Sequence, residues 1–594
     1  MATSFDPEGN PDRRIPLIAA LAVVVGLAGG LAAALLTALI RLITHVAFEG
    51  RLSFTPADPA ATHLGPAVIL VPIAGALIIG MMARWGSEAI RGHGIPEVMD
   101  RILHAESRIP AKLTILKPLS AAVAIGTGGP FGSEGPIIAT GGALGSLLGQ
   151  VTHVTADERK TLLAAGAAAG MAATFGAPVA AVLLAIELLL FEFRARSIVP
   201  VALAACAATS IRLLLLGSAP IFPMPNVLEP SGLALVCYAL LGGAIGAVSV
   251  GITKSLFKVE DLFEKLPLHW MWWPLVGAVV VGLAGYLDPR ILGVGPDNII
   301  NSLAGRLTIA ATAALLLLKF IAWVCYLGSG TSGGTLAPLF TFGSGLGAIA
   351  GAVAAAHFPE LGIAPPVAAL VGMAAMFAGA SRALLTSVVF AFETTRQPLG
   401  LLPLLAGCTS AFLISRLLMR QSIMTEKLAR RGILVQDEYA VDYLARVTVG
   451  SAMTTDVQVV HASDAIASVA VTGAHHVATG HQGFPVLDAT GELVGVVTMR
   501  DLRQPCVSQR VGDLVRQPAV VAYPDQSLRD AADIMVRESV GRLPVVTRTS
   551  PRKLVGIISR SDLLRAHAPR LRAAEHRHQH MDFHSVTGGV FRGE

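Results

Sequence analysis

The stretch Gly126-Thr-Gly-Gly-Pro-Phe-Gly-Ser-Glu-Gly-Pro136 decides the fold, because it recurs later in the chain as Gly328-Ser-Gly-Thr-Ser-Gly-Gly-Thr-Leu-Ala-Pro338. Both copies follow the pattern G-x-G-x-x-x-G-x-x-x-P, and an apolar run follows each of them. Gly and Pro interrupt helices, and interrupted backbone at membrane depth is tolerated only where it is buried in protein or lines a cavity. Two such interruptions in corresponding places predict a transporter of two related halves whose broken helices meet near the bilayer midplane.

The repeat continues downstream of these two segments. Gly166–Glu187 aligns without gaps to Gly372–Glu393, with eight of 22 positions identical, including the terminal Glu. Helices rich in Ala and Gly resemble one another by chance, but the paired Gly and Pro positions and the paired Glu argue against chance here. We therefore predict two halves, at about 15–218 and 231–425.

The composition is that of a membrane protein. The 594 residues are 53% hydrophobic and 14% charged, whereas roughly 25% of a typical soluble domain is charged. Runs such as 15–40, 161–186 and 230–253 contain no charged residue, and about 20 apolar residues suffice to span a bilayer as a helix. The number of such runs argues against buried helices of a soluble protein, so we predict a polytopic α-helical domain over 15–425.

Basic residues flank the apolar runs, for example Arg14, Arg194 and Lys427. The positive-inside bias then predicts an integral, multi-pass protein of the cell membrane with both termini cytosolic. Residues 1–14 form a polar tail, and the first apolar run is too long for a cleaved signal peptide. The five Cys are scattered without a CxxC motif, which disfavours disulfides and thiolate metal sites. No basic, aromatic-interleaved element suggests a nucleic-acid partner.

An anion that crosses lipid needs a replacement for its hydration shell. Helix N-termini supply one, since their backbone N–H groups are unpaired and carry the positive end of the helix dipole. Three segments punctuated by Gly and Pro could start helices inside the membrane: Gly92-His-Gly-Ile-Pro96, Gly132-Ser-Glu-Gly-Pro136 and Gly334-Thr-Leu-Ala-Pro338. Neutral donors suit a permeant ion, because a buried full charge would bind it too tightly.

Glu134 lies inside the second of these segments. A carboxylate there is an anion tethered at an anion site: charged, it competes with the permeant ion for N–H groups, and protonated, it can move away. Ionisable side chains at membrane depth are by default functional. The alternative is a Glu that only caps its helix.

Together the three segments resemble, in order and spacing, the GSGIP, G(K/R)EGP and GxFxP motifs of the CLC family of chloride channels and chloride/proton exchangers. The resemblance covers about residues 15–430. It implies two inverted-topology repeats around a midplane anion site, a homodimer with one pore per subunit, and Glu134 as the gate. It also implies backbone donors at Thr335 and Leu336 for a central site and around Ser133–Gly135 for an outer site. The anion-binding residues so predicted are His93, Gly94, Ile95, Ser133, Gly135, Thr335, Leu336 and Met424, with chloride as the ligand.

This sequence departs from the family motifs in four places. His93 replaces a Ser, Ser133 a basic residue, Leu336 a Phe, and Met424 a pore Tyr. Two hydroxyl donors are thereby lost, whereas the backbone donors remain. His93 either restores a donor through a ring N–H or is a satisfied polar lining. Chloride is the family default, and fluoride, nitrate or bicarbonate stay open.

A fifth departure concerns proton coupling. Typical exchangers of the family carry an internal proton-transfer Glu beside the position of Glu187, where this chain has Leu188. Leu cannot relay a proton, so the sequence favours a gated, passive chloride channel, with a proton-coupled anion exchanger as the alternative. We expect Glu187 and Glu393 to be structural, bonded to backbone donors.

The remainder of the chain is predicted as a 426–448 linker, two repeats at 449–503 and 511–567, and a His- and Arg-rich tail, 568–594, expected to be disordered. Each repeat reads as a strand, a helix, a two-stranded hairpin and a helix, and the pair resembles tandem CBS domains, cytosolic regulatory modules that commonly bind adenine nucleotides. The pattern G-h-h-[ST]-x-x-D occurs in both. It nominates four residues either as nucleotide contacts or as helix caps: Thr498, Asp501, Ser559 and Asp562.

Two other classes of function lack their sequence signatures in this chain. A zinc intramembrane protease needs an HExxH motif, and the dipeptide His-Glu does not occur in this chain. A divalent-cation channel needs acidic residues along its pore, whereas the interrupted segments offer N–H donors. The sequence therefore predicts no enzyme, no metal site and no cofactor beyond the anion and a regulatory nucleotide.

Overall fold

The computed structural model divides the chain into two compact units, 1–439 and 440–594. Residues 1–13 of the predicted N-terminal tail and 569–594 of the predicted C-terminal tail lie outside its described part. The structure describes residues 14–227, 229–433, 444, 447–466, 469, 483–502, 509–515, 518–549 and 552–568.

The first unit is helical, and its described α-helices fall into two series of eight followed by a short helix. The first series is α1 Ile15–Glu49, α2 Leu70–Met81, α3 Ile95–His104, α4 Ala111–Gly126, α5 Glu134–Val151, α6 Ala156–Phe175, α7 Pro178–Leu184 and α8 Ala195–Leu216. The second is α9 Gly232–Glu264, α10 Trp273–Leu287, α11 Pro296–Leu303, α12 Ile309–Gly328, α13 Leu336–His357, α14 Pro365–Ser381, α15 Leu384–Thr395 and α16 Leu401–Leu418. The short helix is α17, Glu426–Arg430.

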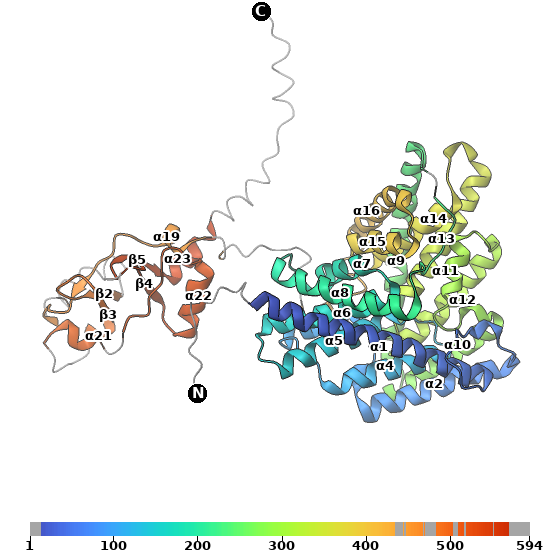
Figure 1. Ribbon diagram of the computed structural model, residues 1–594, viewed down its shortest axis with the longest axis horizontal. Helices are drawn as coiled ribbons and strands as arrows, with labels where there is room; N and C mark the ends of the chain where they lie inside the picture. Colours follow the sequence, from blue (N-terminus) through green and yellow to red (C-terminus); the bar gives the residue numbers. More distant parts are fainter. Residues whose placement is uncertain are drawn as a thin grey trace, which may run out of the picture. The chain divides into compact units, whose positions relative to one another are not determined.

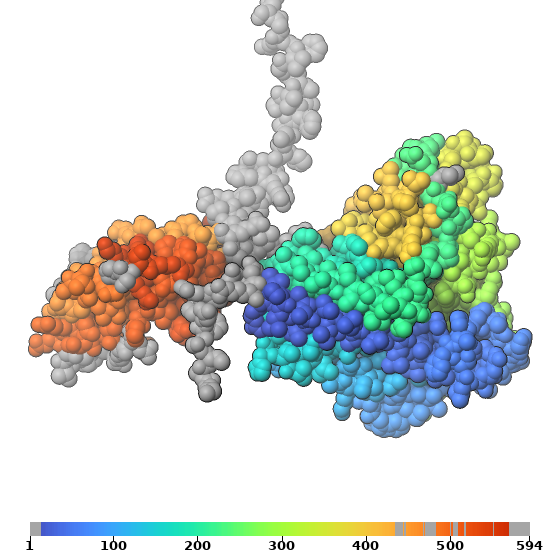
Figure 2. All heavy atoms as spheres, in the orientation of Figure 1, coloured from blue at the N-terminus to red at the C-terminus, as the bar shows by residue number. Residues whose placement is uncertain are grey.

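The two series match element by element at the repeated segments. Each copy of the G-x-G-x-x-x-G-x-x-x-P stretch lies between two helices: α4 and α5 in the first half, α12 and α13 in the second. In Figure 1 the first half runs from blue to green and the second from green to orange. Figure 2 shows α1 lying along α8 at the surface of the unit.

Close backbone packing joins α5 to α6 and α13 to α14, at corresponding positions in the two halves. A Cβ on Gly141 would lie 2.1 Å from the Gly166 carbonyl oxygen, and one on Gly343 would lie 2.3 Å from the Gly372 oxygen. Any larger side chain would push these helices apart. Small residues are how membrane helices approach each other, because apolar matching alone gives no drive to associate in lipid.

The interrupting residues start helices where the sequence predicts. Helix α3 begins at Ile95 with Pro96 in its first turn, after Gly94 adopts φ 98°, a conformation open to glycine. Helix α5 begins at Glu134 and α13 at Leu336, so Pro136 and Pro338 also lie in first turns. Proline costs little there, since the N–H groups of a first turn have no helical partner.

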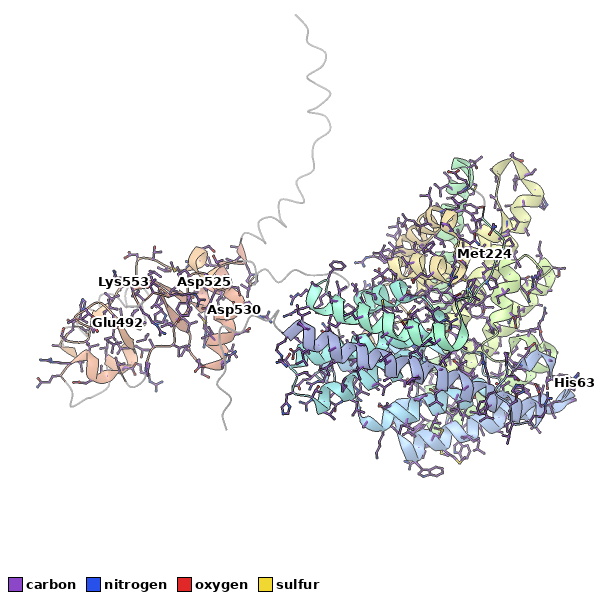
Figure 3. All side chains as sticks on the ribbon, viewed as in Figure 1. His63, Met224, Glu492, Asp525, Asp530 and Lys553 are labelled. Carbon is purple, nitrogen blue, oxygen red and sulfur yellow. The ribbon has the colours of Figure 1, made fainter. Side chains whose placement is uncertain are left out.

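The second unit contains two small sheets. Its elements are α19 Val449–Ala452, β1 Val460–His461, β2 Gly483–Leu487, β3 Leu493–Thr498, α21 Met499–Leu502, α22 Leu528–Arg537, β4 Arg542–Val546, β5 Leu554–Ser559 and α23 Arg560–Arg565. The sheet orders are β1-β2-β3 and β4-β5, and each repeat contains one antiparallel hairpin followed by a helix. The first strand predicted for the second repeat is reduced to a bridge of Ala522 with Val545. Glu492 and Lys553, labelled in Figure 3, form a bridge between the two hairpins.

Candidate anion site

Three loops from different parts of the first unit touch one another. Gly132 and Gly334 form an antiparallel bridge: the Gly334 N–H donates to the Gly132 oxygen at 2.9 Å, and the Gly132 N–H donates to the Gly334 oxygen at 3.3 Å. Gly92 and Ser332 form a second bridge. The two copies of the repeated stretch are thus hydrogen-bonded to each other, and the Gly92 loop joins them.

The same loops bring helix N-termini together. A Cβ on Gly94 would lie 2.4 Å from the Gly135 oxygen, and one on Gly135 would lie 1.9 Å from the His93 oxygen. The starts of α3 and α5 therefore meet, and the Gly132–Gly334 bridge holds the start of α13 beside them. The positive ends of three helix dipoles converge at this junction. Such an arrangement attracts negative charge.

Glu134 lies at the centre of the junction. Its side chain is 1% exposed, and its Oε2 lies 2.8 Å from the position of a Cβ on Gly334. The backbone N–H groups of Glu134 and Ala337 interact with its carboxylate. Because Ala337 belongs to the first turn of α13, the carboxylate of one half occupies the helix N-terminus of the other half.

Several polar atoms at the junction make no hydrogen bond within the described chain. They are both ring nitrogens of His93, Thr335 Oγ1 and Glu134 Oε2, and each of these three residues is 1% exposed. Buried polar atoms are almost always hydrogen-bonded in native proteins. A hydroxyl and an imidazole can both donate to a small anion, so this set of groups fits the ligand predicted from the sequence.

Of the remaining predicted site residues, Ser133, Ile95 and Leu336 lie at the helix starts that form the junction. Ser133 is the N-cap of α5, and Leu336 is the first residue of α13. Ile95, Leu336 and Met424 are buried in one apolar core. The contact that the structure gives Met424 is its own N–H to Ser422 Oγ, at 3.3 Å, so a role for Met424 at the site stays a prediction.

Two cavities approach the junction. The Glu134 cavity, about 800 Å³, is lined by Ser133 and Glu134 together with Arg41, Arg212 and Arg290. These arginines come from α1, α8 and the segment after α10. Arg290 is paired with Asp288 at 2.8 Å, and Asp58 and Asp297 also line the cavity. The Lys117 cavity, about 440 Å³, is lined by Gly92, by residues of α3, α4 and α9, and by Lys427 of α17.

Charged side chains line the Lys117 cavity. Lys117 is 3% exposed and donates to the oxygens of Ile90 and Gly92 at 2.8 and 3.0 Å. Glu97 accepts from the Gly94 N–H at 2.7 Å, and Lys427 pairs with Glu260 at 3.0 Å.

The sequence reasoning missed Ala337, Glu97 and Lys117. A signal existed for Lys117, which is a lone charge within the apolar run 113–125. For Ala337 the signal is that the amides of a whole first turn are unpaired, and not only the first two.

Glu187 and Glu393 are bonded to backbone donors, as predicted. Glu187 accepts from the N–H groups of Leu385 and Thr386, both at 3.0 Å. Glu393 accepts from those of Val179 and Ala180 at 3.1 and 2.8 Å. Each carboxylate thus caps a helix of the opposite half, α15 or α7. Glu187 itself lies in a π-helical turn, Ala185–Leu190, that continues α7.

In the second unit the four nominated residues cap their own helices. Asp501 Oδ2 accepts from the N–H and hydroxyl of Thr498 at 2.9 and 2.5 Å, and Asp562 Oδ2 accepts likewise from Ser559 at 2.9 and 2.6 Å. A cavity of about 390 Å³ is lined by other residues, including Thr490, Glu492 and Lys553. Nucleotide binding by the four residues remains a prediction.

Comparison with known proteins places this geometry in a family. The family model described as voltage gated chloride channel matches residues 74–416. The chain belongs to this CLC family. Models of the CBS domain match residues 449–505 and 511–568. The predicted fold class, a polytopic helical CLC fold with a C-terminal α/β CBS module, is thereby confirmed.

Curated CLC relatives match over most of their own length. The chain is 30% identical to the H(+)/Cl(-) exchange transporter ClcA of Vibrio campbellii over 421 residues, which is 69% of this chain and 88% of the relative. It is 29% identical to ClcA of Yersinia pseudotuberculosis over 431 residues, covering 71% and 89%.

Solved CLC structures share the fold. A slow cyanobacterial Cl⁻/H⁺ antiporter superposes with a TM-score of 0.64 at 24% identity, covering 70% of this chain and 97% of that one. A eukaryotic CLC transporter superposes with a TM-score of 0.59 at 20% identity over 92% of this chain and 97% of that one.

Membership in the CLC family makes the chain an integral, multi-pass membrane protein and a transporter rather than an enzyme. Within its described residues, eight helical stretches are long and apolar enough to cross a membrane. They are Ile15–Glu49, Gly65–Gly86, Ala195–Leu216, Gly232–Glu264, Trp270–Leu287, Ile309–Gly328, Leu336–His357 and Pro398–Leu418.

Proposed function

We propose that this protein exchanges a monovalent anion, chloride by family default, for protons across the cell membrane. Glu134 is the gate, and the CBS pair is a cytosolic regulatory module. Each subunit of a homodimer has its own pore, and both termini are cytosolic, so that the Lys117 cavity, lined in part by Lys427 and Arg431, opens to the cytosol.

One observation carries the proposal: the buried Glu134 carboxylate lies against Gly334, where the two repeated stretches bridge each other, at the start of α13 and beside the Glu134 cavity. An ionised carboxylate and a permeant anion compete for the same N–H groups. Protonation removes the charge of Glu134, frees the amides for the anion and lets the side chain leave. Proton binding and anion movement are thereby linked at one residue.

The sequence alone favoured a passive channel, because Leu188 replaces the internal acid. The comparisons favour the exchanger, since the curated relatives at 29% and 30% identity are named H(+)/Cl(-) exchange transporters. Glu187 does not supply the missing acid in this proposal, because its two carboxylate oxygens already accept backbone hydrogen bonds.

The experiment is simultaneous measurement of anion efflux and proton uptake in liposomes that contain the purified protein. We expect wild-type protein to move both ions, and Glu134→Gln to move the anion without protons, because an amide cannot carry a proton through the gate. Glu360→Gln, at an exposed carboxylate, is the matched control and should behave as wild type. Anion efflux without proton uptake by wild-type protein would establish the channel instead, and no anion movement at any pH or voltage would refute anion transport.

The regulatory part of the proposal has its own test. AMP, ADP and ATP are titrated into the full-length protein by calorimetry, and transport is measured with and without each nucleotide. We expect binding that changes the transport rate. Binding that Asp501→Asn and Asp562→Asn leave unchanged would assign those residues to capping alone.

A further inference from the structure

His93 belongs to the loop before α3, which contributes to the anion junction and precedes residues of the Lys117 cavity. Its backbone oxygen touches the start of α5, and its ring interacts electrostatically with Glu97, Lys117 and Lys427. These three charged residues all line the Lys117 cavity, whereas His93 itself does not. His93 thus stands beside the junction through its backbone and beside the residues of the Lys117 cavity through their charges.

Both ring nitrogens of His93 make no hydrogen bond within the described chain. Most buried histidines are held in one tautomer by a partner on one nitrogen. A ring with two open nitrogens can accept a proton on one side and release the proton of the other side. The imidazole can therefore pass a proton from one side to the other without rotation of the ring.

Burial and the surrounding charges together determine when His93 can hold a proton. Glu97 on α3 brings a negative charge toward the ring, and Lys117 on α4 and Lys427 on α17 bring positive charges. Lys427 is partly offset by its ion pair with Glu260, and ionised Glu134 faces the junction from α5. A buried imidazolium is costly without a further negative charge nearby. An anion bound at the three helix N-termini would supply that charge.

We propose that His93 is the internal proton site of this exchanger and that it takes up its proton together with the anion. A proton passes from water in the Lys117 cavity, by way of the Glu97 carboxylate, to one His93 nitrogen. The other nitrogen gives up its proton to the Glu134 carboxylate, which then releases the α13 amides. In the first transfer an O–H bond of Glu97 breaks and an N–H bond of His93 forms. In the second an N–H bond of His93 breaks and an O–H bond of Glu134 forms, so no proton is gained or lost in the relay.

The inference rests on the proposed exchange and accounts for how exchange proceeds with Leu188 in place of the internal acid. It also follows that anion and proton strengthen each other's binding by the same factor, because linkage is reciprocal.

The decisive measurement is the chloride dissociation constant as a function of pH, by calorimetry, in a Glu134→Gln background where the gate does not titrate. We expect chloride affinity to fall by about tenfold per pH unit as His93 loses its proton, as one linked proton requires. In Glu134→Gln with His93→Asn, which keeps a donor but does not titrate, chloride affinity should be independent of pH. Glu134→Gln with His93→Ser, which restores the family residue, should give the same flat profile.

An unchanged pH slope in both double variants would overturn the inference. In liposomes, His93→Asn with Glu134 intact should reduce the protons moved per anion by at least tenfold, with anion efflux still measurable. Unaltered proton-to-anion stoichiometry would likewise overturn it. Failure of the wild-type protein to move protons would instead refute the proposed exchange, and failure of Glu134→Gln to bind chloride at any pH would refute the anion site.

Discussion

Glu187 and Glu393 cap helices reciprocally: Glu187 of the first half accepts from the first turn of α15, and Glu393 of the second half accepts from the first turn of α7. Thr386 strengthens one side with a hydroxyl bond of 2.6 Å to Glu187. Each half thus supplies the carboxylate that satisfies a helix N-terminus of the other half. The carboxylates at these repeated positions therefore serve assembly of the two halves.

Replacing either capping carboxylate should cost stability in similar measure. In Glu187→Ala or Glu393→Ala, two backbone N–H groups lose their acceptor, which should lower the free energy of unfolding by about 1–3 kcal/mol. Thermal unfolding in detergent measures the loss. The ratio of protons to anions should stay at the wild-type value in surviving protein, and a selective loss of proton movement in Glu187→Ala would identify it as a relay instead.

The contact between α3 and α5 leaves no space for a side chain on Gly135. Gly135→Ala would place a methyl group 1.9 Å from the His93 oxygen, and separating the helix N-termini should abolish anion transport. The control is Gly251→Ala, in α9, where a Cβ would have no neighbour within 4 Å. That change should leave transport intact and raise stability by up to about 1 kcal/mol, because alanine is the better helix former. Equal transport by the two variants would contradict the convergence of helix N-termini.

Arg41 lines the Glu134 cavity and forms no ion pair in the described part of the chain. Arg41→Gln should reduce anion uptake from the Glu134 side by about threefold to fivefold at low salt, and by less at high salt, because screening weakens attraction of the ion to the mouth. Adding Ser133→Arg, which restores the basic residue of the family motif, should recover the lost rate. If neither substitution changes the rate of anion uptake, Arg41 does not attract the anion to the cavity.

Asp488 holds the turn between β2 and β3. Its Oδ1 accepts from the N–H and hydroxyl of Thr490 at 2.9 and 2.6 Å and from the N–H of Glu492 at 2.8 Å. These bonds, chiefly that of the Thr490 hydroxyl, hold the pKa of Asp488 below its ordinary value. Because the pKa of Asp488 is lower in the folded state, ionised Asp488 stabilises the fold. This stabilisation is fully present above the unfolded-state pKa, about 3.9, and is lost as the pH falls through the folded-state pKa.

Thr490→Val removes the hydroxyl bond, so the pKa of Asp488 should rise toward its ordinary value. Thermal unfolding of the CBS unit, followed from neutral pH downward, should then lose stability at a higher pH than in the wild type. Asp488→Asn should remove this part of the acid dependence altogether. Identical acid profiles in all three proteins would show that the turn does not depend on the charge.

Much of the membrane fold could be predicted from Gly and Pro positions. Pro96, Pro136 and Pro338 indicate the starts of α3, α5 and α13 within two residues, because proline is tolerated in a first turn and disrupts a helix interior. The junction of these starts was predictable because the repeated stretches had to lie at corresponding places in two halves. The capping role of Glu187 followed from the same repeat.

Other features depend on contacts between distant segments. The Lys117 cavity takes charged residues from α3, α4, α9 and α17, and no pattern of neighbouring residues predicts which of them face one space. The contact between the Ala337 amide and the Glu134 carboxylate could not be predicted from the sequence, because it joins two segments about 200 residues apart. The preference for a passive channel was the weakest inference, since it rested on the absence of one acid at Leu188 and gave no weight to a substitute such as His93.

Because of the reciprocal caps, the N-terminus of α7 is synthesised long before the carboxylate that caps it. The N–H groups of Val179 and Ala180 wait for a carboxylate 214 and 213 residues further along, which at ribosomal speed is about 10–40 s of elongation. Until Glu393 is made, the N-terminal N–H groups of α7 lack this acceptor. Partial chains that end before Glu393 should therefore remain bound to the insertion machinery and be favoured substrates for membrane quality-control proteases.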